Sequence, residues 1–168
     1  MIYSNEERHM DKNTQRNFMP QGKLKQVNAT VLTPENAGLR LVINACGQNG
    51  KFESKLDLML TKRWSRVRTD FKEWYATQLN FKMGSLNTTA VASDTWVVNM
   101  LVEGKDGKID DKGLQLAAKE LGRLAKAEQA SVHVSSILIN EAPALQQLLV
   151  SNLIEQGINV YIYTEPVA

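Results

Sequence analysis

The stretch LRLVINACGQNGKF at residues 39–52 decides the fold prediction. Its first half is almost continuously apolar, as is typical of a parallel strand that helices cover on both faces. Its second half holds Gly47 and Gly50, and a helical pattern follows it. In open α/β sheets, the loops after the carboxyl ends of strands commonly bind ligands. The stretch therefore predicts a buried strand of an α/β sheet and a candidate ligand-binding loop at residues 44–52.

Outward from this stretch, short β-rich runs alternate with helical patterns. The β-rich runs are KQVNATVL (25–32), LRLVINA (39–45), SLNTTAVA (85–92), DTWVVNMLV (94–102), SVHVSSILI (131–139) and NVYIYT (159–164). Helices are expected over 52–62, after Ser65, over 112–129 with Asp110 or Asp111 as cap, and from Pro143 toward Gly157. The alternation predicts a three-layer α/β fold with a central mixed sheet. Its covered centre is expected to hold the strands that begin near Leu39, Trp96, Ser131 and Asn159.

Length and composition predict one domain. With 168 residues and 43% hydrophobic content, the chain can bury a core of its own. Residues 1–23 are polar and lack an apolar period, so they predict an N-terminal arm before a domain at residues 24–168. Cys46 is the only cysteine, and two histidines accompany it. We therefore expect no internal disulfide, no metal site and no cofactor.

Charge and hydropathy restrict the partners. No apolar run approaches the roughly 20 residues that span a bilayer, and the first residues are charged where a signal peptide is apolar. These features predict a cytoplasmic protein without a membrane partner. The net charge of +2 does not by itself indicate a polyanionic partner. Residues 62–75 combine basic and aromatic side chains, but acidic residues interrupt them, so a solvated helix with buried aromatics is favoured over a nucleic-acid surface.

The loop at residues 44–52 has two readings. Gly47 and Gly50 would let backbone amides approach a phosphate, and Lys51 would add a positive charge beside a helix start. The alternative is a tight strand-to-helix connection built from ordinary turn residues. Asn44 would fix the loop by hydrogen bonds, and Cys46 is interpreted as a small buried residue rather than a nucleophile.

The order of several motifs resembles macro domains, in particular the branch of small ADP-ribose-processing members, over about residues 24–163. The motifs are VNAT (27–30), INACGQNGK (43–51), TKRWS (61–65), KEWY (72–75), DTWVVNMLVE (94–103) and ASVHV (130–134). The resemblance implies a macro-domain fold and an ADP-ribose-type nucleotide ligand, with hydrolase activity as a further possibility. It places Asn28 at the position where many relatives have an aspartate that recognises adenine. Phe52 stands where the family has a loop glycine, and Glu103 stands where relatives often have a glutamine.

The sequence departs from the family where the second phosphate loop is expected. A glycine-rich segment of the family is replaced here by SSILINEAPA at residues 135–144, which removes close backbone access to a diphosphate. Weak ADP-ribose binding and weakened or lost hydrolase activity are therefore expected. No catalytic residue is assigned, and the ligand-binding candidates are Asn28, Asn44, Gly47, Gly50, Lys51, Phe52, Glu103, Asn140 and Glu141.

Two functions remain open at this stage. One is binding of an ADP-ribose-type or related nucleotide, with Glu103 and Glu141 as the nearest acids for positioning water. The other is a macro-like interaction module that has lost nucleotide chemistry and binds a protein or, less expectedly, a nucleic acid. His133 and Trp96 lie in predicted strands and are interpreted as packed residues.

Overall fold

A single mixed sheet organises the chain, and the structure, a computed structural model, describes residues 20–166. The strand order is β1-β6-β5-β2-β4-β3, and all neighbours are parallel except β3 and β4. The strands β6, β5, β2 and β4 hold the central positions, as predicted. Their bounds are β1 (Leu24–Val27), β2 (Arg40–Gly47), β3 (Leu86–Ala92), β4 (Thr95–Glu103), β5 (Ser131–Ser135) and β6 (Val160–Tyr163).

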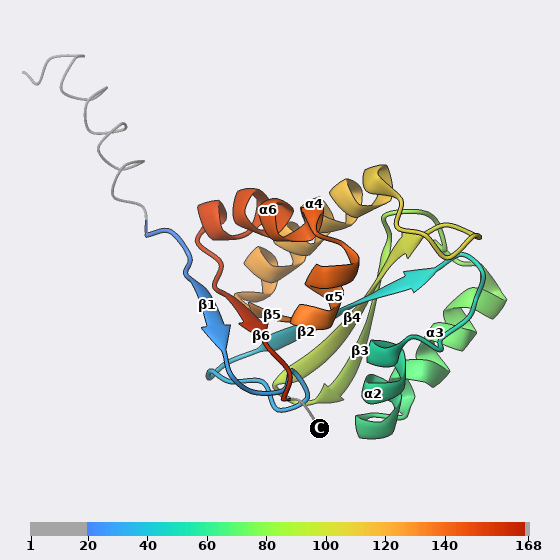
Figure 1. Cartoon of the computed structure of the whole chain (residues 1–168), viewed down its shortest axis with the longest axis horizontal. Helices are drawn as coiled ribbons and strands as arrows, with labels where there is room; N and C mark the ends of the chain where they lie inside the picture. The colour runs from blue at the N-terminus through green and yellow to red at the C-terminus, as the bar shows by residue number, and fades with distance from the viewer. Residues whose placement is uncertain (1–19, 167–168) are drawn as a thin grey trace, which may run out of the picture.

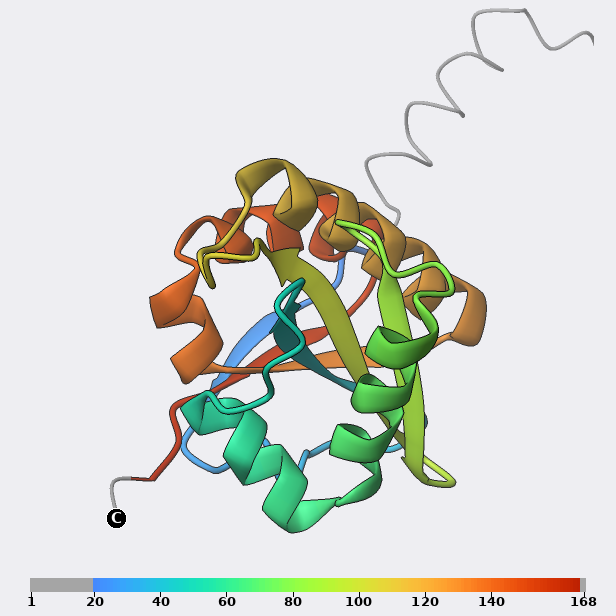
Figure 2. The same cartoon turned by 90° about the vertical axis from the view of Figure 1, so that its right-hand side faces the viewer.

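Helices cover both faces of this sheet. Helices α2 (Lys55–Arg63) and α3 (Arg66–Thr77) lie on one face, and α4 (Asp111–Glu128) and α6 (Ala144–Asn152) lie on the other (Figure 1). The short helix α5 (Ser136–Glu141) follows β5, and a 3-10 turn, η1 (Ile154–Gln156), follows α6. Figure 2 shows the sheet between the two helical layers. The prediction of a three-layer α/β fold with a mixed sheet is confirmed.

Local side chains explain where the helices begin. Asp110 accepts a hydrogen bond from the Gly113 amide at 2.7 Å and caps α4, as one of the two predicted caps. Ser54 and Asp57 form a reciprocal capping box at the start of α2, in which each side chain accepts from the other's backbone amide at 3.0 Å. These caps satisfy amides that have no partner within the helix.

Three predicted boundaries are wrong. The run at 131–139 does not continue as a strand, because α5 begins at Ser136. The Ser135 hydroxyl accepts from the Ile137 amide at 3.2 Å, and Leu138 turns into the core at 1% exposure. Burial of the leucine outweighs the β propensity of this run. The strand predicted over 25–32 stops at Val27, and α6 stops at Asn152, before η1 and Gly157.

Aromatic side chains of α3 pack α3 against the sheet and the loop after β2. Phe71 stacks on Phe52 with their ring centroids 5.1 Å apart, and the Trp74 ring meets the edge of Phe81 at 4.9 Å. Phe52, Phe71 and Trp74 are all buried. The interpretation of this helix as a solvated element with buried aromatic residues is therefore confirmed for Phe71 and Trp74. Trp96 is partly buried against the same core.

Residues 1–19 of the predicted arm lie outside the described residues. The remaining part, residues 20–23, contacts the domain: the Gly22 amide donates to the Ile154 carbonyl at 2.8 Å, and the Lys23 amide donates to Asn159 at the same sheet edge. Within residues 20–166, no helix is long and apolar enough to cross a membrane.

Candidate functional site

The predicted site segments meet at the carboxyl edge of the parallel strands. Asn28 follows β1, α5 follows β5, the loop at residues 48–54 follows β2, and Glu103 ends β4. Parallel neighbours end at the same edge, and the strand order places these segments side by side. This edge is the candidate site.

A buried polar network lies beneath the edge. Asn44 donates from Nδ2 to Asp57 Oδ1 at 2.8 Å and to Asn99 Oδ1 at 2.9 Å, which ties β2 to α2 and β4. All three side chains are at most 5% exposed, and Nδ2 of Asn99 has no partner among the described residues. Asn44 therefore links sheet and helix rather than facing a ligand. Sequence reasoning missed Asp57, although the capping pattern SKLD at 54–57 was a usable signal.

The loop after β2 uses its own amides internally. The Gln48 amide donates to the Glu103 carbonyl at 3.0 Å, and the Gly50 amide donates to the Gly47 carbonyl at 3.2 Å. The Lys51 amide donates to Asn49 Oδ1 at 3.0 Å. Gly50 has a φ of 74°, a conformation that favours glycine. The loop is thus a tight connection, and these three amides are not free for a phosphate.

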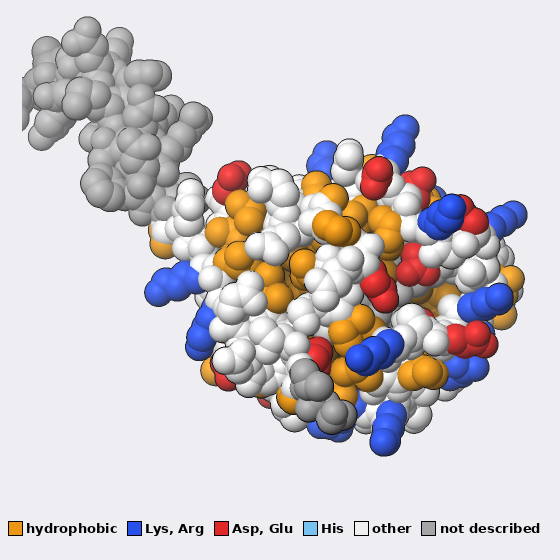
Figure 3. Space-filling view, viewed as in Figure 1, with side chains coloured by type: hydrophobic (Ala, Val, Ile, Leu, Met, Phe, Trp, Pro, Cys, Tyr) orange, Lys and Arg blue, Asp and Glu red, His pale blue; other side chains and the backbone are white. Residues whose placement is uncertain are grey.

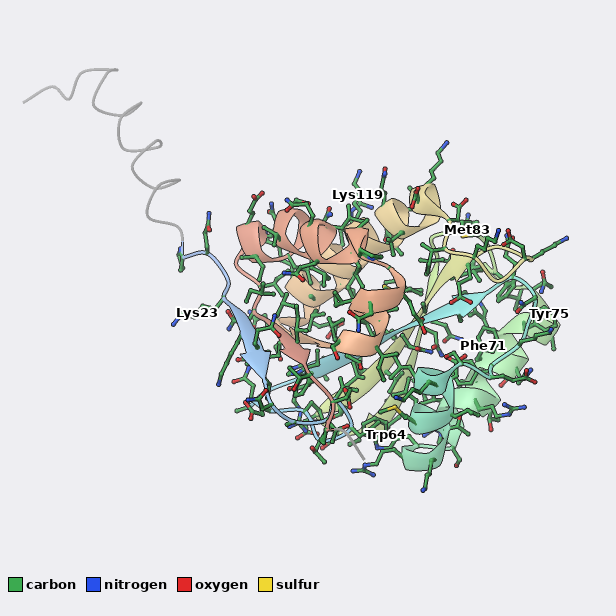
Figure 4. All side chains as sticks on the ribbon, viewed as in Figure 1. Lys23, Trp64, Phe71, Tyr75, Met83 and Lys119 are labelled. Atoms are coloured by element: carbon green, nitrogen blue, oxygen red, sulfur yellow. The ribbon has the colours of Figure 1, made fainter. Side chains whose placement is uncertain are left out.

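Helix α3 holds this loop from outside. Lys72 donates from Nζ to the Gly50 carbonyl at 2.6 Å, and Arg68 donates to the Phe52 carbonyl at 3.1 Å. A Cβ added to Gly50 would lie 2.5 Å from the Tyr75 ring. Figure 4 shows Phe71 and Tyr75 on the helix that borders the loop. Two of the basic side chains in this helix therefore bind backbone carbonyls.

Carboxyl groups gather at the loop. A Cβ added to Gly47 would lie 3.1 Å from Glu103 Oε1, so the Glu103 carboxyl lies against the loop glycine. Burial, and then the charges of Asp57 and Glu141, raise the pKa of Glu103 to about 7. Burial and the charge of Asp57 also raise the pKa of Glu141. In Figure 3, acidic side chains lie between the positions of α5 and α2. The site is therefore electronegative when these groups ionise.

The remaining candidates are distributed unevenly around this edge. Lys51, Asn140 and Glu141 are exposed, and Asn28 is exposed while its Oδ1 accepts from the Thr164 hydroxyl at 3.2 Å. Phe52 is completely buried against Phe71, so its side chain belongs to the core and cannot line a surface site. Of the predicted ligand contacts of Phe52, only those of its backbone are compatible with this burial.

Two groups that could resemble catalytic residues are inert in this fold. Burial, with the charges of Asp57 and Glu103, raises the pKa of Cys46 well above its usual value, so the thiol stays protonated. His133 is buried between the Ser131 and Tyr163 hydroxyls at 2.7 Å each, and burial lowers its pKa to about 3. The interpretation of His133 as a packed, hydrogen-bonded residue is confirmed. Among residues 20–166, no cluster of His, Cys, Asp or Glu could hold a metal ion.

Solved structures show which fold this is. A macrodomain protein from Streptomyces coelicolor matches 86% of this chain and 100% of its own, with a TM-score of 0.80 and 20% identity. A protein of unknown function from Bacteroides thetaiotaomicron covers 84% of this chain and 98% of its own at a TM-score of 0.78 and 22% identity. The chain therefore has the macrodomain fold, as the sequence resemblance implied.

One more distant neighbour was solved with a ligand. Thermosipho africanus DarTG in complex with ADP-ribose matches 77% of this chain and 38% of its own, with a TM-score of 0.61 and 15% identity. No protein-family profile matches the sequence, and no curated protein is significantly similar to it.

Glu103 gives this site a pH dependence that can be measured. Its pKa is about 7 in the folded chain, above its usual 4.5, so the folded state keeps a proton that the unfolded state releases. The carboxyl therefore lowers stability progressively as pH rises from about 4.5 to about 7. We expect the free energy of unfolding of Glu103→Gln, measured with urea, to equal that of the wild type near pH 4.5 and to exceed it at pH 8. The control is Glu155→Gln on η1, and a pH-independent difference for Glu103→Gln would refute the expectation.

Proposed function

We propose that this protein is a diverged macrodomain-fold binding protein for an ADP-ribose-type or related nucleotide, with hydrolase action weakened or lost. The fold and the position of the candidate site support a ligand at the carboxyl edge. The ADP-ribose complex of one structural neighbour supports the ligand class. The site favours the less charged parts of such a ligand over its diphosphate.

One observation carries the weakened phosphate chemistry in this proposal: three amides of the first loop already have acceptors, and the Glu103 carboxyl at the end of β4 lies against the loop. The amides of Gln48, Gly50 and Lys51 already have acceptors, so a phosphate would have to displace these hydrogen bonds. Glu103 lies against Gly47, and Glu141 extends the same negative charge from α5. An incoming diphosphate meets like charge and finds three of the loop amides already hydrogen-bonded, whereas an uncharged nucleoside avoids the charge repulsion.

A series of ligands with no, one and two phosphate groups tests the proposal. We expect adenosine to bind at least as tightly as AMP, and AMP more tightly than ADP-ribose, by calorimetric titration at pH 8. Glu141→Gln removes one charge from the exposed end of α5 and is expected to strengthen ADP-ribose binding about two- to tenfold, as one charge at moderate distance allows. The matched control Glu155→Gln should leave all three affinities unchanged. Binding that becomes tighter with each added phosphate would contradict the proposal.

The alternative function is an interaction module without nucleotide chemistry, and the open β3 edge of the sheet favours it. Failure of all three ligands to bind would support it. A nucleic-acid partner is less favoured, because Arg68 and Lys72 already bind loop carbonyls and the Phe71 and Trp74 rings are buried.

A further inference from the structure

The strand β3 forms an open edge of the sheet. It pairs with β4 alone, and its sequence LNTTAVA contains neither a charged residue nor a proline. Charged residues, prolines and β-bulges are common devices that keep an edge strand from pairing with another chain, and of these β3 has only a register shift between Ala90 and Ala92, at its end. The Ser85 carbonyl accepts from the Leu101 amide at 2.9 Å, so alternate residues of the strand face β4. The backbone groups of Leu86, Thr88 and Ala90 therefore point away from the sheet.

A hollow flanks this edge on each face. On the α4 side, a hollow of about 730 Å³ is lined by Leu86, Thr88 and the exposed Leu116. On the α3 side, a smaller hollow of about 270 Å³ is lined by Asn87 and by Leu79, which is 71% exposed. Side chains of a strand point alternately to the two faces. An added strand would thus send its side chains alternately into the two hollows.

Charge distinguishes the two hollows. The charged residues of the α3-side hollow are both acidic, Asp70 and Glu73. The α4-side hollow has apolar walls that include Leu116 and Leu124. Its Arg123 is ion-paired with Glu120 at 2.7 Å, and Lys82 adds a positive charge, so this hollow does not attract basic side chains. An added strand that is complementary to both hollows would direct its basic side chains toward α3 and its apolar side chains toward α4.

The same charges disfavour a second copy of this chain. Two copies that pair antiparallel through β3 are related by a two-fold axis perpendicular to the joined sheet. Such an axis places both α3 helices on one face, so Asp70 and Glu73 would approach their own counterparts. A partner with basic side chains avoids this repulsion.

We propose that β3 binds an extended segment of a partner protein by strand addition, with alternating basic and apolar side chains in the two hollows. The backbone groups of Leu86, Thr88 and Ala90 supply the pairing, and the two hollows supply the specificity. This surface lies at the β3 edge and does not depend on the nucleotide site.

A synthetic peptide tests the pairing and its specificity together. The probe is a capped seven-residue peptide of alternating lysine and leucine, and the comparator carries glutamate in place of lysine. We expect the full chain to bind the lysine peptide at least tenfold more tightly than the glutamate peptide, by fluorescence anisotropy at low micromolar concentrations. Methylation of alternate peptide nitrogens on the pairing edge should weaken binding at least tenfold, because it removes donors to β3 without changing the side chains.

Charge-reversal variants of the protein distinguish peptide binding at the β3 edge from binding at other acidic surfaces. Glu73 is an exposed residue of α3. The Glu73→Lys variant is expected to bind the lysine peptide at least tenfold more weakly than the wild type, with an unchanged circular dichroism spectrum. Glu155→Lys, on η1, should change the affinity less than twofold. Absence of binding, equal binding of the two peptides, insensitivity to N-methylation, or a dimer formed through β3 in sedimentation equilibrium would each overturn the proposal.

Discussion

Replacing Phe71 with alanine is expected to lower the free energy of unfolding by about 3–5 kcal/mol, the usual cost of removing a buried phenylalanine. Phe71 is completely buried. Its ring lies 5.1 Å from Phe52, 6.4 Å from Trp74 and 6.2 Å from Phe81, centroid to centroid. The alanine variant would leave a cavity between α3 and the loop after β2. The loop should then lose its support, because Phe52 rests on this ring.

Urea unfolding of the purified chain measures this cost. Leu79→Ala is the matched control, since it also truncates a large apolar side chain near α3 but at a site that is 71% exposed. We expect that control to change stability by less than about 0.5 kcal/mol. Hydrogen exchange should also show faster exchange of the Gly50 amide in Phe71→Ala. Equal costs for the two variants would show that the aromatic cluster does not support the loop.

Sequence patterns were sufficient to predict the layers and which four strands form the centre of the sheet. Leu41, Val42 and Ile43 are apolar without alternation, which only a strand covered on both faces requires, and all three are fully buried. The Asp110 cap and the amphipathic helix after it depend on neighbours in the sequence, so they too could be read locally.

The features that the sequence did not predict correctly depend on contacts between residues that are distant in the sequence. The run after Ser135 has β-branched residues, yet Leu138 gains more by entering the core as part of a helix than the strand would gain by continuing. The spacing of the two glycines in the first loop favoured an ordinary turn but left a phosphate cradle open. The choice between these readings required the acceptors of the loop amides, and one of them, the Glu103 carbonyl, lies on another strand.

The second large expected effect is weak binding of ADP-ribose. Each missing backbone hydrogen bond to a charged phosphate costs about 1.5–3 kcal/mol. Three such losses add to about 4.5 kcal/mol or more, which is enough to move a micromolar dissociation constant beyond the millimolar range. The first loop has already used the amides of Gln48, Gly50 and Lys51, and α5 replaces the second loop. The Glu103 carboxyl adds repulsion above its pKa of about 7.

Calorimetric titration of ADP-ribose into the full chain at pH 8 tests this central claim most directly. The occupied loop amides and the neighbouring carboxyl groups of Glu103 and Glu141 predict no saturation below about 1 mM ligand. A one-to-one complex with a micromolar dissociation constant would contradict it, because such affinity requires the loop amides or α5 to rearrange into the phosphate cradle that this structure lacks.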